Sequence, residues 1–354
     1  DHYAVELWQQ RVENLRTQTG LDDITPQLPD MTSQDITRPL YSAVFTAHPV
    51  FALKPEVSAA MCHHAVAKAG VVPHDAFAPR QSVTLDDEHG EAMAALKHAR
   101  AAINEINADI LRQLRSADPD GWRKTLPAMI NVSTWVGYDL DGRSDISWTD
   151  SFRLRLREKY MALRGYERAV RDSKIDMLSP VADRLAVGCA TTSQHLKAFE
   201  AVESGKAEFD TVMNALTEDP DRLVSSHALA KEIHQIAQDI PDEEDALTAL
   251  VIAADISTHG FGMGEVHLRI NAAQIRNAMR PVDGRTISVS DGVSSPRLLI
   301  ERLALRIRKE SAWDISFASL DGETATARRQ LMLATQFLKH IDSDQPVRLL
   351  IAEC

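Results

Sequence analysis

The sequence has few cysteines, few aromatic residues and no long apolar run. Its three cysteines, Cys62, Cys189 and Cys354, are too few and too widely spaced for a disulfide framework or a thiolate metal site. No apolar run approaches the roughly 18–20 residues that a membrane-spanning helix needs, and the first residues lack the basic-then-apolar pattern of a signal peptide. We therefore expect a cytoplasmic protein with no membrane partner.

Basic residues are also in the minority. Lys and Arg number 39 against 51 Asp and Glu, so the formal net charge is -12. A field of this sign repels nucleic-acid phosphates and anionic membranes, so no nucleic-acid partner is expected, although a local basic pocket remains compatible with it. Aromatic residues make up only 5% of the chain, while Ala and Leu are abundant, and this balance favours helices over a β-sandwich.

Hydrophobic periodicity predicts many helices and four short strands along the chain. Apolar residues at three- and four-residue steps predict helices over 2–19, 59–68, 91–114, 148–173, 179–205, 207–216, 226–239, 243–258, 297–310 and 323–340. Short apolar or alternating runs predict strands near 41–48, 129–137, 264–271 and 346–352. Long helical stretches separate these strands, so we expect them to be parallel and connected by helical crossovers.

This order of elements predicts a mainly α fold with an α/β core. It is typical of a (β/α)8 barrel with large helical insertions, of which four strands are half. We treat 1–354 as a single unit. The chain starts inside a helical pattern without a Met and stops inside a strand pattern, so we expect both ends to continue into something longer.

Candidate site residues lie at the carboxyl end of the first predicted strand and along one face of the third. His48 closes the first strand just before Pro49, which cannot donate to a sheet ladder. On the third strand, period-two alternation places three polar side chains on one face, His267, Arg269 and Asn271. Since crossover helices should cover a parallel sheet, a polar face indicates a hydrated functional lumen; the alternative is the exposed face of an edge strand.

The turn after the second strand is acidic and glycine-containing. Its candidate residues are Asp139, Asp141, Gly142 and Arg143. Functional loops gather at the carboxyl ends of parallel strands. However, Asp and Gly are common in turns regardless of function, so turn formation alone remains an alternative interpretation.

Two further charged or polar runs are interpreted as structural. Cys62, His63 and His64 are adjacent on a predicted helix, where neighbouring side chains point about 100° apart and cannot chelate one ion together. No metal ligand is therefore assigned to this chain. Basic residues at steps of two spread around their helix, which favours a solvated surface over an anion site. They are Arg153, Arg155, Arg157 and Lys159.

The same strand-end motifs carry a resemblance to the phosphoenolpyruvate carboxylase family. Phe45-Thr-Ala-His-Pro resembles the first signature of that family, and Trp135-Val-Gly-Tyr-Asp-Leu-Asp-Gly is similar to the second. The run from Phe261 to Ile270 aligns without gaps to the family's third strand, and Pro346 to Cys354 lies where the family has its fourth. The four matches occur in the family's order and span nearly the whole chain.

The resemblance implies a helical protein built around an eight-stranded barrel, a cytoplasmic homo-oligomer, normally a homotetramer, that uses Mg²⁺. Its activity would be carboxylation of phosphoenolpyruvate with bicarbonate to oxaloacetate and phosphate. The family's histidine base maps onto His48. Its phosphate-binding arginine falls on Asn271, and Arg269 two residues earlier lies on the same face. His267 and Arg143 complete the substrate-binding residues that we assign.

The sequence departs from the family at several functional positions. After Pro49 the family's Thr-Glu and paired arginines become Val50-Phe51 and Lys54-Pro55, and in the second signature an arginine becomes Leu140. The family's metal-binding carboxylates, catalytic lysine and glycine-rich loop belong to later strands. We therefore expect the Mg²⁺ ligands in the carboxyl-terminal half, and no activity from these 354 residues alone.

Two other interpretations stay open. One is a non-catalytic homologue of the carboxylases that serves as a regulatory or assembly module. The other is an unrelated all-helical interaction protein in which the short strands are absent.

Overall fold

The computed structural model describes residues 36–46, 54, 56–57, 59–61, 63, 83–139, 146–203, 205, 207–278 and 315–352. The helices predicted over 2–19 and 297–310, and most of the one over 59–68, lie outside these residues. The statements below concern the described ranges.

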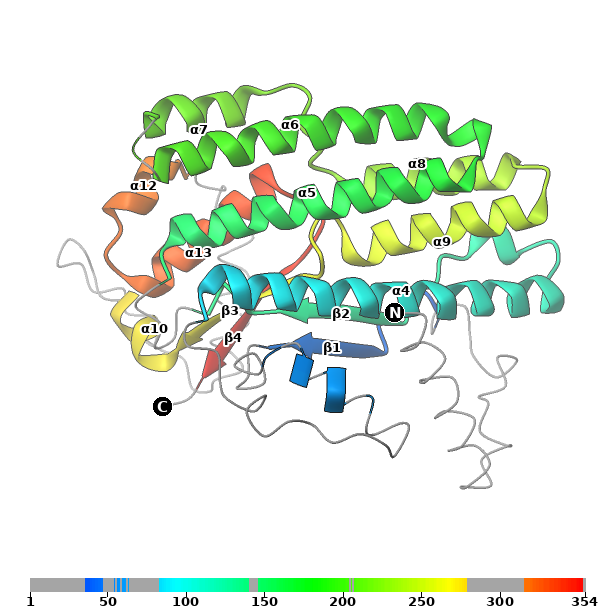
Figure 1. The fold of residues 1–354 in the computed structure, drawn as a ribbon, viewed down its shortest axis with the longest axis horizontal. Coiled ribbons are helices and arrows are strands. Elements are labelled where there is room, and N and C mark those ends of the chain that lie inside the picture. Colours follow the sequence, from blue (N-terminus) through cyan, green and yellow to red (C-terminus); the bar gives the residue numbers. More distant parts are fainter. Residues whose placement is uncertain are drawn as a thin grey trace, which may run out of the picture.

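Four parallel strands form one sheet at the base of the molecule in Figure 1. They are β1 Tyr41–Phe45, β2 Ile130–Thr134, β3 Glu265–Asn271 and β4 Val347–Ala352, paired in the order β1-β2-β3-β4. The predicted strands and their parallel direction are confirmed, so the all-helical interpretation is wrong. Strands that are adjacent in the sheet are also consecutive in the chain, as they are in a (β/α) barrel. In a doubly wound sheet, by contrast, the strand order reverses at a switch point.

The sheet is open in the described part of the chain. β1 and β4 are its two edges, and apolar side chains on them are exposed, including Tyr41 at 65% and Ile351 at 59%. Exposed parallel edges normally require a covering element or a further strand. Closure into an eight-stranded barrel stays a prediction.

The long helices of the crossovers lie on one side of the sheet (Figure 1). Between β1 and β2 the structure describes the long helix α4 Leu85–Ala117, the short 3-10 helix Trp122–Lys124, and helical residues at 56–57 and 59–61. Between β2 and β3 the structure describes the α-helices α5 Trp148–Ser173, α6 Ser179–Glu203, α7 Phe209–Glu218, α8 Ser226–Asp239 and α9 Glu243–His259. Between β3 and β4 the structure describes α10 Ala272–Ala278, α12 Phe317–Gly322 and α13 Thr326–His340.

Side-chain caps explain where the long helices begin. Thr84 and Asp87 form a capping box at the start of α4, and Ser147 and Asp150 form another at α5. The bounds of α5 and α8 agree with the prediction. The predicted helix over 323–340 begins later, at Thr326, while residues 317–322 form the separate helix α12.

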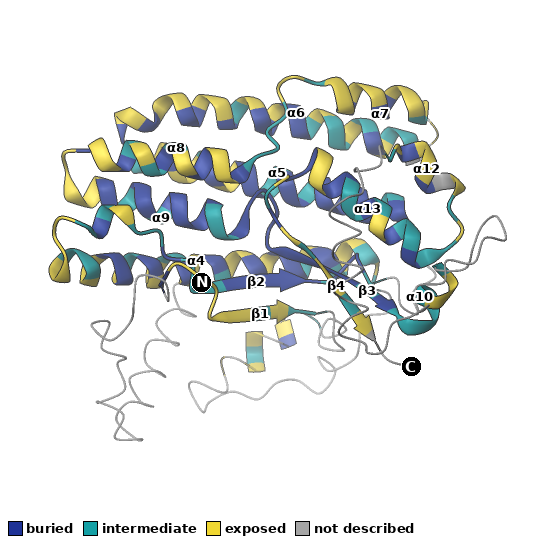
Figure 2. Ribbon diagram, turned by 180° about the vertical axis from the view of Figure 1, so that it is seen from behind, coloured by how far each residue is buried: buried dark blue, intermediate teal, exposed yellow. Residues whose placement is uncertain are grey.

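The core lies between the sheet and the helices. Figure 2 shows β2 and β3 as buried, whereas β1, β4 and the outer faces of α6 and α7 are exposed. One apolar cluster joins β2 to α4, α5, α8 and α9, and a second, rich in aromatic rings, joins β3 to α5, α6, α7, α12 and α13. None of the described helices is long and apolar enough to cross a membrane.

Candidate functional site

The sheet face turned away from the helices carries a row of polar side chains. Ser133 on β2 is the register partner of Glu265 on β3, and register partners in a parallel sheet point to the same side. His267 and Arg348 are partners in the same way on β3 and β4. We call this set the polar face: Asn131, Ser133, Glu265, His267, Arg269 and Arg348.

The opposite sheet face is apolar and contacts the helices. Val132 lies in the first core cluster, and Val266 and Leu268 lie in the second. The sequence-based division of β3 into a polar and an apolar side is therefore what the structure shows. The polar residues of β2 and β4 were not singled out, although the alternation Ile-Asn-Val-Ser in β2 carries the same signal.

Several buried atoms of the polar face have no hydrogen-bond partner among the described residues. They are both ring nitrogens of His267, Asn131 Oδ1 and Ser133 Oγ. His267 is only 6% exposed, and burial lowers its pKa, so the ring is neutral at pH 7. A buried donor or acceptor left without a partner is costly, so this group of atoms indicates a place for a polar ligand or a further segment of chain.

Arg269 lies at the carboxyl end of β3 and is held by the turn that follows β2. Its Nη1 donates to Asp139 Oδ2 at 2.7 Å, and its guanidinium lies 5.0 Å from the centre of the Trp135 ring. Asp139 also forms an isolated parallel bridge with Arg269. The chain therefore leaves the sheet after Thr134, turns, and returns to it at Asp139, which brings the second and third motifs together.

A second ion pair lies on the polar face near the amino ends of β3 and β4. Arg348 Nη2 donates to Glu265 Oε1 at 3.1 Å, and Arg348 Nε donates to the other carboxylate oxygen. Glu265 is 5% exposed, whereas half of the Arg348 side chain is accessible. The bidentate pair neutralises both groups and ties β4 to β3.

Asn271 has a structural role at the start of α10. Its side-chain oxygen accepts from the backbone N–H of Gln274 at 2.8 Å, and the Gln274 side chain accepts from the Asn271 backbone N–H at 3.0 Å. This reciprocal pair is a helix N-cap. The amide oxygen of Asn271 is thus occupied, and of the polar residues predicted on β3, His267 and Arg269 are better placed for a ligand.

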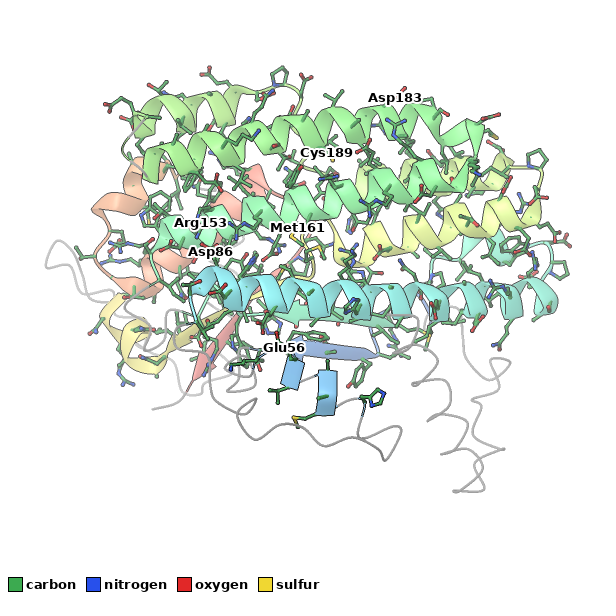
Figure 3. The ribbon with its side chains drawn as sticks, viewed as in Figure 1. Glu56, Asp86, Arg153, Met161, Asp183 and Cys189 are labelled. Carbon is green, nitrogen blue, oxygen red and sulfur yellow. The ribbon has the colours of Figure 1, made fainter. Side chains whose placement is uncertain are left out.

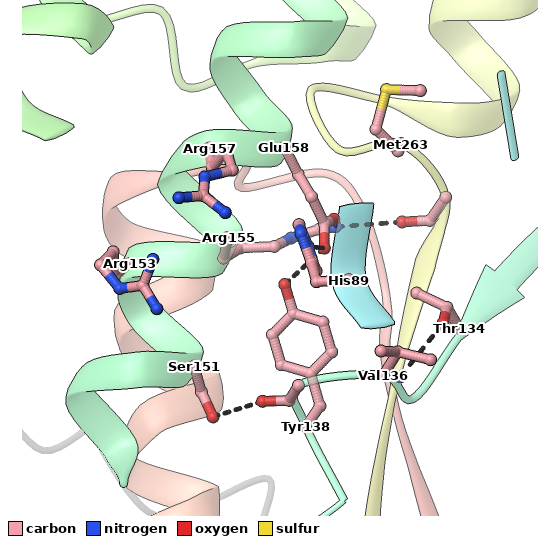
Figure 4. A network of polar contacts seen from close by, with 12 residues as sticks. His89, Thr134, Val136, Tyr138, Ser151, Arg153, Arg155, Arg157, Glu158 and Met263 are labelled. Carbon is pink, nitrogen blue, oxygen red and sulfur yellow. Dashed lines mark hydrogen bonds and ion pairs between the residues drawn. The ribbon is translucent and has the colours of Figure 1, made fainter. Parts of the chain in front are cut away.

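A buried network of hydrogen bonds connects the turn that follows β2 to α4 and α5 (Figure 4). Tyr138 donates its hydroxyl proton to Glu158 Oε1 at 2.6 Å, His89 contacts the same oxygen at 3.0 Å, and Arg155 pairs with the other one. Burial raises the pKa of Tyr138, so the phenol keeps its proton. Burial alone would raise the pKa of Glu158 as well, but Arg155 and the contacts from His89 and Tyr138 together outweigh it, so the pKa is lowered and the carboxylate stays ionised.

The network reaches both strands that carry the site. Arg155 donates to the backbone oxygen of Gly264, just before β3, at 3.1 Å. Ser151 donates to the backbone oxygen of Gly137 at 2.7 Å. Gly137 has φ 89°, and a side chain there would collide with Leu154. The position of Asp139 is therefore set by α5.

The prediction of a solvated surface is wrong for three of the four basic residues of α5. Arg153 is 7%, Arg155 4% and Lys159 2% exposed, because the amino-terminal half of α5 is buried, whereas Arg157 is half-buried. Partners from elsewhere neutralise or solvate them: Arg153 pairs with Asp86 at 2.9 Å (Figure 3), and Lys159 donates to the backbone oxygen of His340 at 3.1 Å. These residues have a structural role.

Several predicted site residues cannot be located. His48, Asp141, Gly142 and Arg143 lie outside the described residues. Within the described ranges no group of three His, Cys, Asp or Glu side chains could hold a metal ion. Of the described acids at the site, Asp139 and Glu265 are each paired with an arginine. The described residues therefore do not fit a Mg²⁺ site.

No protein-family model matches the chain, and no curated protein sequence matches it.

Proposed function

We propose that this chain forms part of an enzyme that carboxylates phosphoenolpyruvate with bicarbonate, giving oxaloacetate and phosphate. The observation that carries the proposal is the bond between Arg269 and Asp139. It joins two motifs that lie 130 residues apart and that both resemble signatures of the carboxylase family. The parallel strand order supports it, since all four motifs then follow one another along a single sheet.

The chemistry assigns a task to each candidate residue. A bicarbonate oxygen attacks the phosphorus of phosphoenolpyruvate, and the bond from phosphorus to the enol oxygen breaks, leaving carboxyphosphate and an enolate. A base takes the proton of carboxyphosphate, which divides into CO₂ and phosphate, and the enolate carbon then attacks CO₂. In this proposal Arg269 compensates the phosphoryl charge and His48 is the base.

Arg269 suits an exchangeable anion contact. The described structure shows one of its five N–H groups donating to Asp139, and one third of the side chain is exposed to solvent. The Trp135 ring holds the guanidinium plane in place, so a fork of donors can meet a phosphate without a large loss of side-chain entropy.

A second candidate function rests on the charge balance of the polar face. Arg269 is paired with Asp139, Arg348 with Glu265, and His267 is neutral, so these five groups carry no net positive charge. A phosphate dianion is held poorly by a neutral surface. This balance favours the non-catalytic homologue, in which the sheet serves as a regulatory or assembly module.

Direct binding of phosphoenolpyruvate separates the two functions. We expect calorimetric titration of the chain to show binding that Arg269→Ala weakens about tenfold, as for the loss of a charge-assisted contact. Arg276→Ala is the matched control, because Arg276 is an exposed arginine on α10. Absence of binding by both this chain and the full-length gene product would overturn the enzyme proposal and leave the module.

A further inference from the structure

A pocket of about 440 Å³ lies between α4, α5 and α9, away from the polar face. Its walls include Ala101 from α4, Gly165 and Ala169 from α5, and Ile252 from α9. This volume falls within the range of roughly 300–1,000 Å³ that is typical of small-molecule sites. It is therefore large enough for an organic ligand.

Small residues at the helix contact leave this space. A side chain built at Gly165 would meet nothing within 4 Å. Gly in the middle of a helix destabilises it by about 0.5–1 kcal/mol relative to Ala, so Gly165 is not explained by helix propensity. Ala101 and Ala169 flank the same space, and the pocket stays open to solvent.

The charges around the pocket are mainly positive. Lys97 from α4, with Arg164 and Arg168 from α5, line its exposed part. Among the described lining residues the one acid is Asp255, which is already paired with Arg100 at 2.9 Å. In a chain with a formal net charge of -12, this is a local basic pocket.

The inner wall is rigid and its donors are satisfied. Arg100 is 7% exposed and donates to both oxygens of Asp255, to the hydroxyl of Tyr166 at 2.7 Å and to the backbone oxygen of Gly262. Tyr166 donates in turn to the backbone oxygen of Gly260 at 2.6 Å. These bonds hold the three helices and the segment before β3 in fixed positions.

One lining atom is not satisfied. Asn104 Oδ1 is buried and has no hydrogen-bond partner among the described residues. Asn104 lies one turn beyond Arg100 on α4, and its oxygen can accept a hydrogen bond only from a group inside the pocket or from water. The pocket thus combines cations at its mouth, apolar walls and a buried acceptor.

We propose that this pocket binds a small organic anion that has an apolar body and a hydrogen-bond donor. The anionic group meets Lys97, Arg164 and Arg168, the apolar part covers Gly165 and Ala169, and the donor meets Asn104 Oδ1. Gly260 and Gly262 lead into the amino end of β3, whereas Arg269 lies near its carboxyl end. The site is therefore distinct from the polar face and does not depend on the carboxylation proposal.

The test uses 8-anilinonaphthalene-1-sulfonate, which has a sulfonate, apolar rings and one N–H donor. We expect saturable binding by fluorescence and calorimetry, weaker at high salt, and weaker still for the neutral N-phenyl-1-naphthylamine. Gly165→Leu fills the space and should abolish binding. Arg164→Gln with Arg168→Gln should weaken it about tenfold and leaves the pocket open, so it tests the charges even if Gly165→Leu fails to fold.

Arg171→Gln is the matched control, since Arg171 is an exposed arginine on α5 that does not line the pocket. Unchanged affinity in this variant, together with losses in the other two, supports the proposal. If the double arginine variant binds the sulfonate as tightly as the unmodified chain, or if Arg171→Gln loses as much, the probe binds elsewhere and the proposal is overturned.

Discussion

Arg269 donates to Asp139 across 2.7 Å, and this bond connects the carboxyl end of β3 to the turn that follows β2. Asp139 is held in turn by a chain of contacts through Tyr138 and Glu158 to α5. The charge that Arg269 presents to a ligand is therefore set by a residue whose position is fixed in the core.

Replacing Asp139 by Asn should release the positive charge of Arg269. We expect affinity for phosphoenolpyruvate to rise about threefold to tenfold, because the loss of this partly buried ion pair leaves the guanidinium free for the phosphate. Asp109→Asn on α4 is the control, since Asp109 pairs with Arg112 on an exposed surface. Calorimetry of both variants checks this, and weaker binding by Asp139→Asn would show that the carboxylate itself is needed.

Lys159 should make stability depend on pH. Burial, together with Arg222 and Arg155, lowers its pKa from 10.5 to about 7, although Asp342 partly opposes this. Below pH 7 the Lys159 ammonium is charged in both the folded and the unfolded chain. The whole free-energy cost of burying the charge is then present in the folded state. Between pH 7 and 10.5 the unfolded chain binds the extra proton, so stability rises with pH by up to about 1.4 kcal/mol per unit.

Lys159→Met removes this dependence. We expect the variant to be more stable than the unmodified chain at pH 6, by a margin that shrinks as pH rises toward 10. Urea unfolding at several pH values measures the margin. Lys231→Met, at an exposed position on α8, should differ from the unmodified chain by less than about 0.5 kcal/mol at every pH. A constant margin for Lys159→Met would contradict a lowered pKa.

Gly137 should tolerate no side chain. With φ 89° and Leu154 against it, Gly137→Ala is expected to lower the free energy of unfolding by about 1–3 kcal/mol. Gly90→Ala is the matched change, because Gly90 lies within α4 with nothing within 4 Å of the added methyl group. That variant should gain about 0.5–1 kcal/mol. Equal effects of the two changes would refute the argument that α5 sets the turn.

Much of the fold could be predicted because its signals are local. The four strands and the bounds of α5 and α8 follow from apolar spacing and from turn residues between elements. The polar side of β3 also follows from alternation, since side chains on a strand point to opposite faces in turn.

The burial of α5 could not be predicted in the same way. Arg155 pairs with Glu158 on its own helix, but its further partner, the backbone oxygen of Gly264, and the partner of Lys159, the backbone oxygen of His340, come from positions more than 100 residues away. Spacing along one helix contains no information about such contacts. The cap at Asn271 could not be predicted from alternation along β3 either, because that role depends on the bond from the backbone N–H of Gln274 in the helix that follows.

The central claim is that a protein containing this chain carboxylates phosphoenolpyruvate. The most direct measurement is oxaloacetate formation from phosphoenolpyruvate and bicarbonate by the full-length gene product, with His48→Asn and Arg269→Ala assayed beside it and Arg276→Ala as control. We predict turnover that His48→Asn nearly abolishes, that Arg269→Ala reduces through a raised KM, and that Arg276→Ala leaves unchanged. Absence of oxaloacetate from the unmodified protein, or full activity of His48→Asn, would contradict the account.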